Sequence, residues 1–531
     1  MKFLPVGRQN FEGIINENLL YVDKTRQVYN LIRQGQLYFM SRPRRFGKSL
    51  LVSLFKHLFS GKKELFKDLY IGKETDYDFQ EYPVLQFNFA NYGAKVTNLE
   101  EILSSELDRL AADFNVSINT VSLSLQFQKL VENIAQKGKP VVLLIDEYDK
   151  PIVDFLTEVE QARINQGILR RFFGPLKGLE SAGHLRFLFI TGVSKFSKVS
   201  LFSDLNNLTD ISIHTLSHDL LGITQEELVE NFREHITSVA TKFDVTEEEL
   251  LINMKKWYNG YSYNGETRLY NPFSLLQFFL NQKFSYYWFA TGTPTFLVET
   301  IRDRGISPRE YEQVKANEDF LTKFSLEDLN MSGLLFQTGY LTIKDIVYRK
   351  FIPYYNLSYP NMEVRHAMMS NLVEAFTFKP SSTTNTSLIK MQDALEEGSV
   401  EQFINALKVI LSSLKYNWQP PKQYKSEEEL LRMWEGYFHA ILYVITSYME
   451  MFVEAEIAHY KGRLDLVAET EEYIYLMEFK MDGTAKEALA QIKTREYAVP
   501  YQNSDKKVFL VGINFSNEER NVEDWEAEEY Y

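Results

Sequence analysis

The chain has 531 residues, and at roughly 100 to 200 residues per domain this length predicts three or four domains. Its balance of 45% hydrophobic and 24% charged residues excludes disordered, collagen-like and coiled-coil chains, and the lack of cysteine excludes disulfides, thiolate metal sites and thiol nucleophiles. The formal net charge of −14 would repel nucleic acid if it were spread evenly, so any surface that binds nucleic acid has to be a local patch.

The charge is in fact uneven along the chain. Residues 1–63 hold 12 Lys or Arg against three acids, whereas residues 516–531 hold seven acids and one Arg. We expect the second run to be a solvated acidic tail. The first residues lack the apolar core of a signal peptide, and no run approaches the roughly 18 apolar residues that span a bilayer, so the sequence predicts a cytoplasmic protein with no membrane partner.

Four strand-like runs, at 37–40, 83–90, 140–146 and 185–192, are separated by long stretches compatible with helices. This alternation predicts an α/β fold with a parallel sheet for a first domain at 1–214. Residues 215–379 are expected to form a mostly helical middle domain. The polar run PSSTTNTS at 380–387 predicts a linker at 380–388, which leaves 389–531 as a third domain that also contains strands.

A phosphate site is predicted where the first strand meets the following helix. Gly47 would let the backbone approach an anion at the helix N-terminus, Lys48 would reach the β and γ phosphates, and Ser49 would ligate Mg²⁺. The pattern GxxxxGK[ST] also asks for a glycine five residues earlier, where this chain has Arg42. The loop residues Arg44, Arg45 and Phe46 complete the predicted nucleotide-binding set.

The third strand-like run, VVLLID, supports this prediction because it ends in Asp146 and Glu147. Asp146 would hold Mg²⁺ directly or through water, and Glu147 could orient and deprotonate the attacking water. Thr191 or Ser194, after the fourth strand, could contact the γ-phosphate. Arg44 and Arg45 could stabilise transition-state charge, or could instead pair with acids such as Asp149.

Several motifs together resemble the AAA-ATPase-like family of bacterial proteins. They are YVDKT at 21–25, SRPRRFGKSL at 41–50, LLIDEYDKPI at 143–152, LFSDLNNLTDIS at 201–212, YNPFSLLQFF at 270–279 and YWFATGTPTFLVE at 287–299. In that family the missing first glycine is usual. The resemblance implies a P-loop NTPase-like fold that binds and hydrolyses ATP.

The segment GRLDLVAETEEYIYLMEFK predicts two strands, 462–469 and 473–480, joined by a polar turn. If Glu471 and Glu472 form a two-residue loop, opposed residues have numbers that sum to 943, so Asp465 faces Glu478. Lys480 then points to the same face. Opposed carboxylates repel each other unless a divalent cation such as Mg²⁺ or Mn²⁺ neutralises them, so the pair predicts a metal site. The alternative interpretation is an exposed hairpin whose charges only aid solubility.

This D…ExK arrangement resembles the PD-(D/E)XK nuclease superfamily over roughly residues 425–515. Asp465, Glu478 and Lys480 match its core positions, and Gln491 matches a helix glutamine of many members. Glu435 matches the first acidic position more loosely, and Glu454 and Glu456 compete with it. A nuclease domain of this kind commonly follows an AAA-ATPase-like domain in bacterial chains.

The leading hypothesis is therefore an enzyme: an ATPase joined to a Mg²⁺- or Mn²⁺-dependent nuclease that acts on DNA or RNA. The alternative is a nucleotide-sensing switch or recruitment protein in which one catalytic site is degenerate. ATP and nucleic acid are the expected partners, and the sequence leaves homo-oligomerisation open.

Overall fold

The computed structural model describes residues 1–120, 122–195, 201–202, 205–288, 298, 301, 308–322, 330–377, 381–412, 440–441, 443–445, 447–448 and 464–530. Unit 1 consists of Met1–Gly292 and Gln313–Val364, and unit 2 of Thr293–Glu312 and Arg365–Tyr531. The predicted first domain therefore groups with most of the predicted middle domain, and the finer boundaries at 214 and 379 stay predictions. Within the described ranges, no helix is both long and apolar enough to cross a bilayer.

A parallel five-stranded sheet forms the core of unit 1, in the order β2-β3-β4-β1-β5. The strands are β1 (Leu37–Ser41), β2 (Val84–Asn88), β3 (Val141–Asp146), β4 (Leu185–Gly192) and β5 (Thr209–Asp210). The predicted α/β fold and its four strands are confirmed, and only the two-residue β5 was not anticipated. Because all pairings are parallel, the carboxyl ends of β1, β3 and β4 meet at one edge of the sheet.

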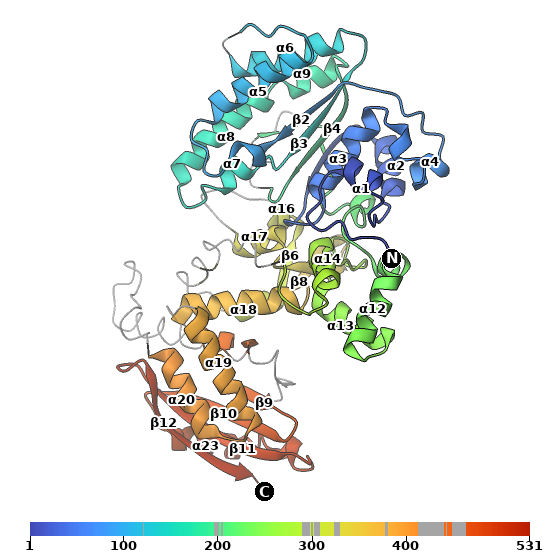
Figure 1. Cartoon of the computed structure of the whole chain (residues 1–531). Helices are drawn as coiled ribbons and strands as arrows, with labels where there is room; N and C mark the ends of the chain where they lie inside the picture. The colour runs from blue at the N-terminus through green and yellow to red at the C-terminus, as the bar shows by residue number, and fades with distance from the viewer. Residues whose placement is uncertain are drawn as a thin grey trace. The chain divides into compact units, whose positions relative to one another are not determined.

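Helices pack on both faces of this sheet (Figure 1). Phe55 on α3 packs against Phe187 and Phe189 of β4, while Phe127 on α6 packs against Phe87 of β2. The helices are α1 (Phe11–Asn16), α2 (Thr25–Gln34), α3 (Lys48–Phe59), α4 (Tyr70–Lys73), α5 (Leu99–Asp113), α6 (Leu123–Ala135), α7 (Lys150–Val153), α8 (Val159–Phe173) and α9 (Leu176–Ser181). A sheet buried on both sides explains why its strands read as continuous apolar runs.

The rest of unit 1 is mostly helical, as predicted, but it also contains a small antiparallel sheet in the order β6-β8-β7. Its strands are β6 (Val314–Asn317), β7 (Thr342–Arg349) and β8 (Ile352–Ser358). The helices are α11 (Gln225–Asn231), α12 (Arg233–Phe243), α13 (Glu247–Tyr258), α14 (Pro272–Asn281), α16 (Glu318–Thr322), α17 (Met331–Thr338) and α18 (Met362–Thr377), the last of which continues into unit 2. Asn271 begins α14 by accepting hydrogen bonds from two backbone N–H groups, and Pro272 follows at the first helical position.

The motif YVDKT has a structural role. The Lys24 ammonium forms a partly buried ion pair with Glu227 of α11, at 2.6 Å, and Asp23 accepts hydrogen bonds from Thr25 and from the backbone of Tyr70. These contacts tie the start of α2 to α4 and α11.

Unit 2 is built on a mixed sheet in the order β12-β11-β10-β9. The strands are β9 (Leu466–Glu469), β10 (Tyr473–Met481), β11 (Lys507–Ser516) and β12 (Asn521–Tyr530), and the helices of the described residues include α19 (Ser381–Glu396), α20 (Val400–Leu411) and α23 (Ala485–Thr494). Leu489 and Ile492 of α23 pack on one face of the sheet. On the other face the Tyr475 hydroxyl donates to the Leu395 carbonyl of α19, at 2.7 Å, so both faces are covered.

Two expectations for this region are wrong. Residues 381–388 of the predicted linker form the first part of α19, because Leu388, Met391 and Leu395 bury one side of that helix and outweigh the polar residues before them. Residues 521–530 of the predicted acidic tail form β12, which pairs antiparallel with β11 along its length. Its carboxylates lie mainly on the exposed outer strand, where charge discourages pairing with another chain.

Glu363, in the first turn of α18, is fully buried in unit 1. It accepts a hydrogen bond from the Trp288 backbone N–H, at 2.8 Å, and the Trp288 indole donates to the Arg44 carbonyl, at 3.1 Å. Burial raises the pKa of Glu363 to about 7, and the hydrogen bond from the Trp288 backbone, together with nearby polar groups of Ser274 and Tyr287, opposes the rise. The α18 helix is thus connected through one tryptophan to the loop after β1.

Substituting Gly512 should destabilise unit 2. A Cβ at this position of β11 would lie 2.2 Å from the Ala485 carbonyl oxygen and 2.8 Å from the Leu489 nitrogen of α23. Gly512→Ala is expected to cost about 1–3 kcal/mol in free energy of unfolding, measured by chemical denaturation. The control Gly178→Ala, in α9 with no atom within 4 Å of the added carbon, should be neutral or stabilising. Equal stability of the two variants would contradict the close packing of α23.

Glu363 should make the folded protein less stable as the pH rises. Its pKa is about 7 in the folded protein against 4.5 ordinarily, so the folded state binds the proton more tightly than the unfolded state. The resulting stabilisation is complete below about pH 4.5 and is lost as the pH rises through about 7. Glu363→Gln is therefore expected to match wild type at low pH and to exceed its free energy of unfolding at about pH 8 by on the order of 1–3 kcal/mol. A difference between the two proteins that does not change with pH would count against this.

Candidate functional site

The loop between β1 and α3 has the geometry of an anion site at a helix N-terminus. Gly47 adopts φ 96° immediately before α3, and Arg45 has φ 64°, so two positions of the loop lie in the left-handed region. The Lys48 side chain is buried, and its ammonium donates to the Arg42 and Pro43 carbonyls at 3.0 and 2.9 Å. The Lys48 ammonium therefore binds backbone carbonyls of the loop between β1 and α3.

Arg42, at the position of the missing glycine, anchors this loop. Its guanidinium is buried, donates to the carbonyls of Ser41, Ser212 and Ser217, and stacks over the Tyr263 ring with 3.6 Å to the ring centroid. Phe46 is also buried, in edge-to-face contact with Tyr261 and Tyr263. Phe46 is thus placed to hold the loop against the segment after α13, and its expected contact with nucleotide stays a prediction.

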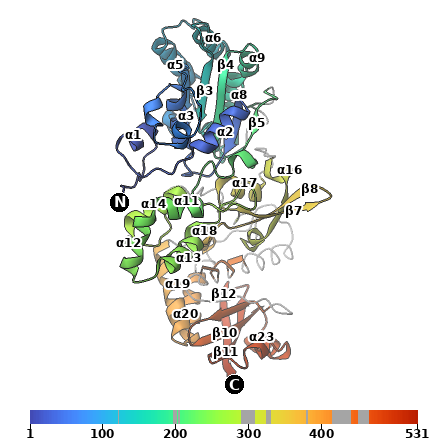
Figure 2. The same ribbon diagram turned by 90° about the vertical axis from the view of Figure 1, so that its right-hand side faces the viewer.

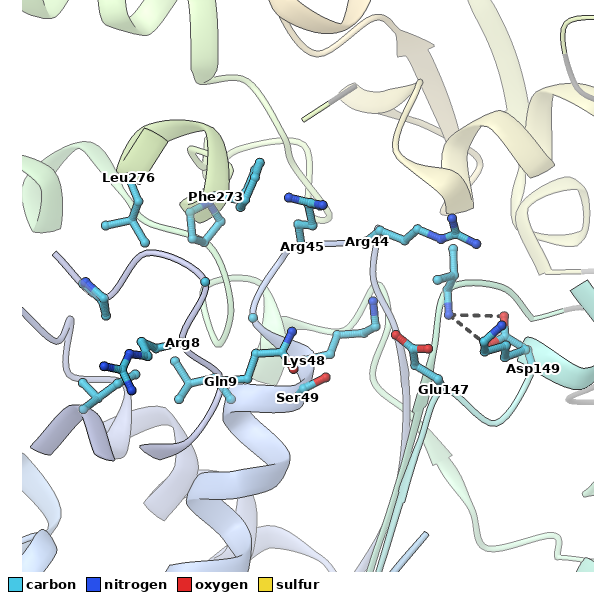
Figure 3. A pocket seen from close by; sticks show the side chains of 18 of the residues that line it. Arg8, Gln9, Arg44, Arg45, Lys48, Ser49, Glu147, Asp149, Phe273 and Leu276 are labelled. Carbon is cyan, nitrogen blue, oxygen red and sulfur yellow. Dashed lines mark hydrogen bonds between the residues drawn. The ribbon is translucent and has the colours of Figure 1, made fainter. Parts of the chain in front are cut away.

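A cavity of about 550 Å³ opens beside the loop (Figure 3), a size that accommodates a nucleotide. Its lining includes the sequence-predicted residues Arg44, Arg45, Gly47, Lys48, Ser49 and Glu147. The structure adds Arg8 and Gln9 from the N-terminal segment and Phe273 from α14. The Arg45 guanidinium lies over the Phe273 ring, 3.8 Å from its centroid, which leaves the short motif YNPF at the edge of the cavity.

The two acids at the end of β3 have unequal surroundings. Asp146 is 1% exposed, and neither of its oxygens has a well-formed hydrogen bond to a described residue, although the Ser49 hydroxyl is near enough to lower its pKa. Burial nevertheless raises the pKa of Asp146 and of Glu147, while burial lowers the pKa of Lys48 against the pull of these same acids. Glu147, at φ 52°, faces the cavity. A buried carboxylate without a full set of partners beside Ser49 fits a site for Mg²⁺.

The structure does not favour the expected contact of Thr191 with the γ-phosphate. Thr191 is fully buried within β4 and donates to the Met40 carbonyl at 2.8 Å, so its hydroxyl is used to join two strands. Ser194 donates instead to Asp149, at 2.7 Å. Asp149 also accepts from the backbone N–H groups of Val193 and Ser194, and it therefore fixes the loop after β4.

In unit 2, the pairing of β9 with β10 confirms the predicted register. Ile474 lies opposite Glu469 and Met477 opposite Leu466, so each pair sums to 943. Asp465 comes directly before β9 and accepts a hydrogen bond from the Phe479 backbone, at 2.9 Å, which holds it next to Glu478. Asp465 is exposed, whereas Glu478 is 3% exposed.

Gln491, on α23, connects Lys480 and Glu478. Its side-chain carbonyl accepts from the Lys480 ammonium at 2.5 Å, and its amide donates to Glu478 Oε1. The capping box of Thr484 and Glu487 fixes the start of α23 and so the position of Gln491. The ammonium of Lys480 lies 3.9 Å from Glu478 Oε1. The structure thus brings together Asp465, Glu478, Lys480 and Gln491.

The Glu478 carboxyl is electrostatically strained without a cation. Burial and then the charge of Asp465 raise its pKa to about 7, and Lys480 and Gln491 only partly oppose this. Its Oε2 atom has no hydrogen-bond partner among the described residues. A buried oxygen without a partner, next to a second carboxylate, fits a ligand pair for Mg²⁺ or Mn²⁺.

A third acidic ligand is not identified. In the described part of the chain, three or more acidic or histidine side chains do not gather into a group that could hold a metal ion. Glu435, Glu454 and Glu456, the candidates from the sequence, lie outside the described residues.

Comparison with known proteins finds the two domain families that the sequence resembles. Residues 5–202 match a family model described as "Predicted AAA-ATPase", and residues 433–525 match one described as "PD-(D/E)XK nuclease superfamily". The chain is 34% identical over 534 residues to an "Uncharacterized protein in vnfD 5'region" of Azotobacter chroococcum mcd 1, and the match covers 98% of each chain. No solved structure gives a significant match. The chain therefore belongs to a family in which an AAA-ATPase-like domain is joined to a domain of the PD-(D/E)XK nuclease superfamily.

Proposed function

We propose that the protein is an ATPase joined to a Mg²⁺- or Mn²⁺-dependent nuclease, and that ATP regulates cleavage of DNA or RNA. The observation that carries the proposal is the buried Glu478 carboxyl, which lies next to Asp465 and is linked through Gln491 to Lys480. These residues form an acidic pair next to an ammonium group at the end of a covered sheet. The match to the PD-(D/E)XK nuclease superfamily supports phosphodiester cleavage as the chemistry of this site.

In the ATP site each residue has a distinct role. The N-terminal N–H groups of α3 would bind phosphate, and Lys48 would exchange its two loop carbonyls for phosphate oxygens. Ser49 and Asp146 would hold Mg²⁺, which neutralises the charge of the triphosphate when it is bound. Glu147, whose pKa is raised by burial, would accept the proton of the attacking water.

In the nuclease site the exposed Asp465 and the buried Glu478 would hold the divalent cation. When bound, the cation polarises the phosphodiester and favours attack by water. Lys480, kept in place by Gln491, would stabilise the charge that develops on the phosphate. Gln491 acts through Lys480 and Glu478, and is therefore a positioning residue.

Regulation by ATP would use the connection through Trp288. The Arg44 carbonyl lies in the phosphate loop, and Trp288 connects it to Glu363 at the start of α18, whose later residues belong to unit 2. If ATP binding moves the loop after β1, the Arg44 carbonyl that accepts from the Trp288 indole would move with it. Trp288 would then change its contact with Glu363 at the start of α18.

ATP binding should depend on Lys48. Lys48→Ala is expected to weaken binding of a fluorescent ATP analogue on the order of tenfold or more, because a buried ammonium contact to phosphate is lost. The control Lys56→Ala removes an exposed lysine from the same helix and should bind as wild type. Glu147→Gln should keep binding but slow hydrolysis on the order of 100-fold or more. Unchanged binding by Lys48→Ala would contradict the assignment of the ATP site.

Cleavage should depend on Asp465 and Lys480. Asp465→Asn and Lys480→Ala are each expected to slow Mn²⁺-dependent cleavage of plasmid, single-stranded DNA or RNA on the order of 100-fold or more. Asp505→Asn and Lys486→Ala, which change exposed residues of unit 2, serve as matched controls. If the site variants cleave like wild type, the nuclease assignment is wrong. ATP binding without any cleavage by wild type would favour a recruitment protein with a degenerate nuclease site.

A further inference from the structure

The β7–β8 hairpin of unit 1 ends in an exposed tip, here defined as residues 347–354. Arg349 pairs with Ile352, so Lys350 and Phe351 form a two-residue turn. Both have positive φ, 50° and 66°, which is the arrangement of a type I′ turn. Such turns favour Asn-Gly, and a bulky aromatic residue at positive φ is unusual. Phe351 at the end of the hairpin therefore has a strained backbone conformation.

Large apolar side chains are concentrated on this tip. Phe351 is 98% exposed and Tyr348 68% exposed, and Val347, Ile352 and Tyr354 are exposed as well. The cross-strand pairs put Val347 and Tyr354 on one face and Tyr348 on the other, so both faces are apolar. An exposed apolar patch with this organisation indicates a binding surface.

The charge of the tip is positive. Arg349 and Lys350 lie among the aromatic residues, and residues 346–355 contain no acid, in a chain whose net charge is −14. The Arg349 guanidinium lies over the Tyr354 ring, 5.5 Å from its centroid, which orients it along one face of the hairpin. The tip therefore offers both the local positive charge that a polyanion requires and flat rings that can stack.

We propose that the hairpin tip binds unpaired bases of nucleic acid, in a single strand or at a frayed duplex end. Phe351 and Tyr348 would stack on bases, while Arg349 and Lys350 would contact the backbone phosphates. The proposal rests on the proposed nuclease function for its choice of partner, since a membrane surface or a second protein would also accept apolar side chains. The positive charge around stacking rings favours nucleic acid.

The test uses the full-length protein in EDTA, so that binding is measured without cleavage. The double variant Lys350→Asn, Phe351→Gly places the preferred residues in the turn and should melt at or above the wild-type temperature. Its affinity for a labelled single-stranded oligonucleotide, measured by fluorescence anisotropy, should fall about tenfold or more. Arg349→Ala should weaken binding and reduce the slope of log affinity against log salt by roughly 0.7.

Matched controls come from α13, where Ile252→Ala and Lys255→Ala remove an exposed apolar and an exposed basic residue and should bind as wild type. The proposal is overturned if the stable double variant binds the oligonucleotide as wild type does. It is also overturned if that variant loses only self-association or binding to anionic vesicles. If the double variant loses oligonucleotide binding but the wild type shows no nuclease activity, the tip binds nucleic acid and the proposed nuclease function is wrong. The two proposals can therefore fail independently of each other.

Discussion

The burial of Glu478 next to Asp465 determines the chemistry of unit 2. Two carboxylates at the end of a covered sheet repel each other, and the low solvent exposure of Glu478 increases the cost of its charge. Gln491 donates to Oε1, and the Lys480 ammonium lies 3.9 Å from that same atom. Oε2 is left without a partner among the described residues, so a proton or a metal cation there would reduce this cost. The packing of α23 on the sheet keeps Gln491 in place, so the stability of unit 2 and the chemistry of its site are connected.

The phosphate loop of unit 1 is held in place by a buried arginine. Arg42 stands where a glycine is expected, and it fastens the loop through backbone carbonyls and the Tyr263 ring. The positive φ values that the loop requires occur at Arg45 and Gly47 instead. The loop therefore gains rigidity from a buried cation, and it keeps backbone N–H groups at the start of α3 for an anion.

The parts that could be predicted from the sequence follow local patterns. Register in the β9–β10 hairpin was predictable because side chains alternate strictly and the polar pair Glu471–Glu472 marks the turn. The polar start of α19 was mispredicted because burial of Leu388, Met391 and Leu395 decides its structure. The acidic β12 was mispredicted because its backbone pairs with β11, and such long-range pairing leaves no local pattern in the sequence. Contacts such as Trp288 with Arg44 join residues far apart in the sequence and leave no local signal at all.

The metal site of Asp465 and Glu478 is best tested by a calorimetric titration of the whole chain with Mn²⁺ in the absence of nucleotide. We expect one binding event in wild type that is accompanied by release of a proton below about pH 7, since Glu478 must lose its proton to bind a cation. Glu478→Gln should abolish the binding event. Binding of equal strength in that variant, or no binding by wild type, would contradict the claim that these two carboxylates form a metal site.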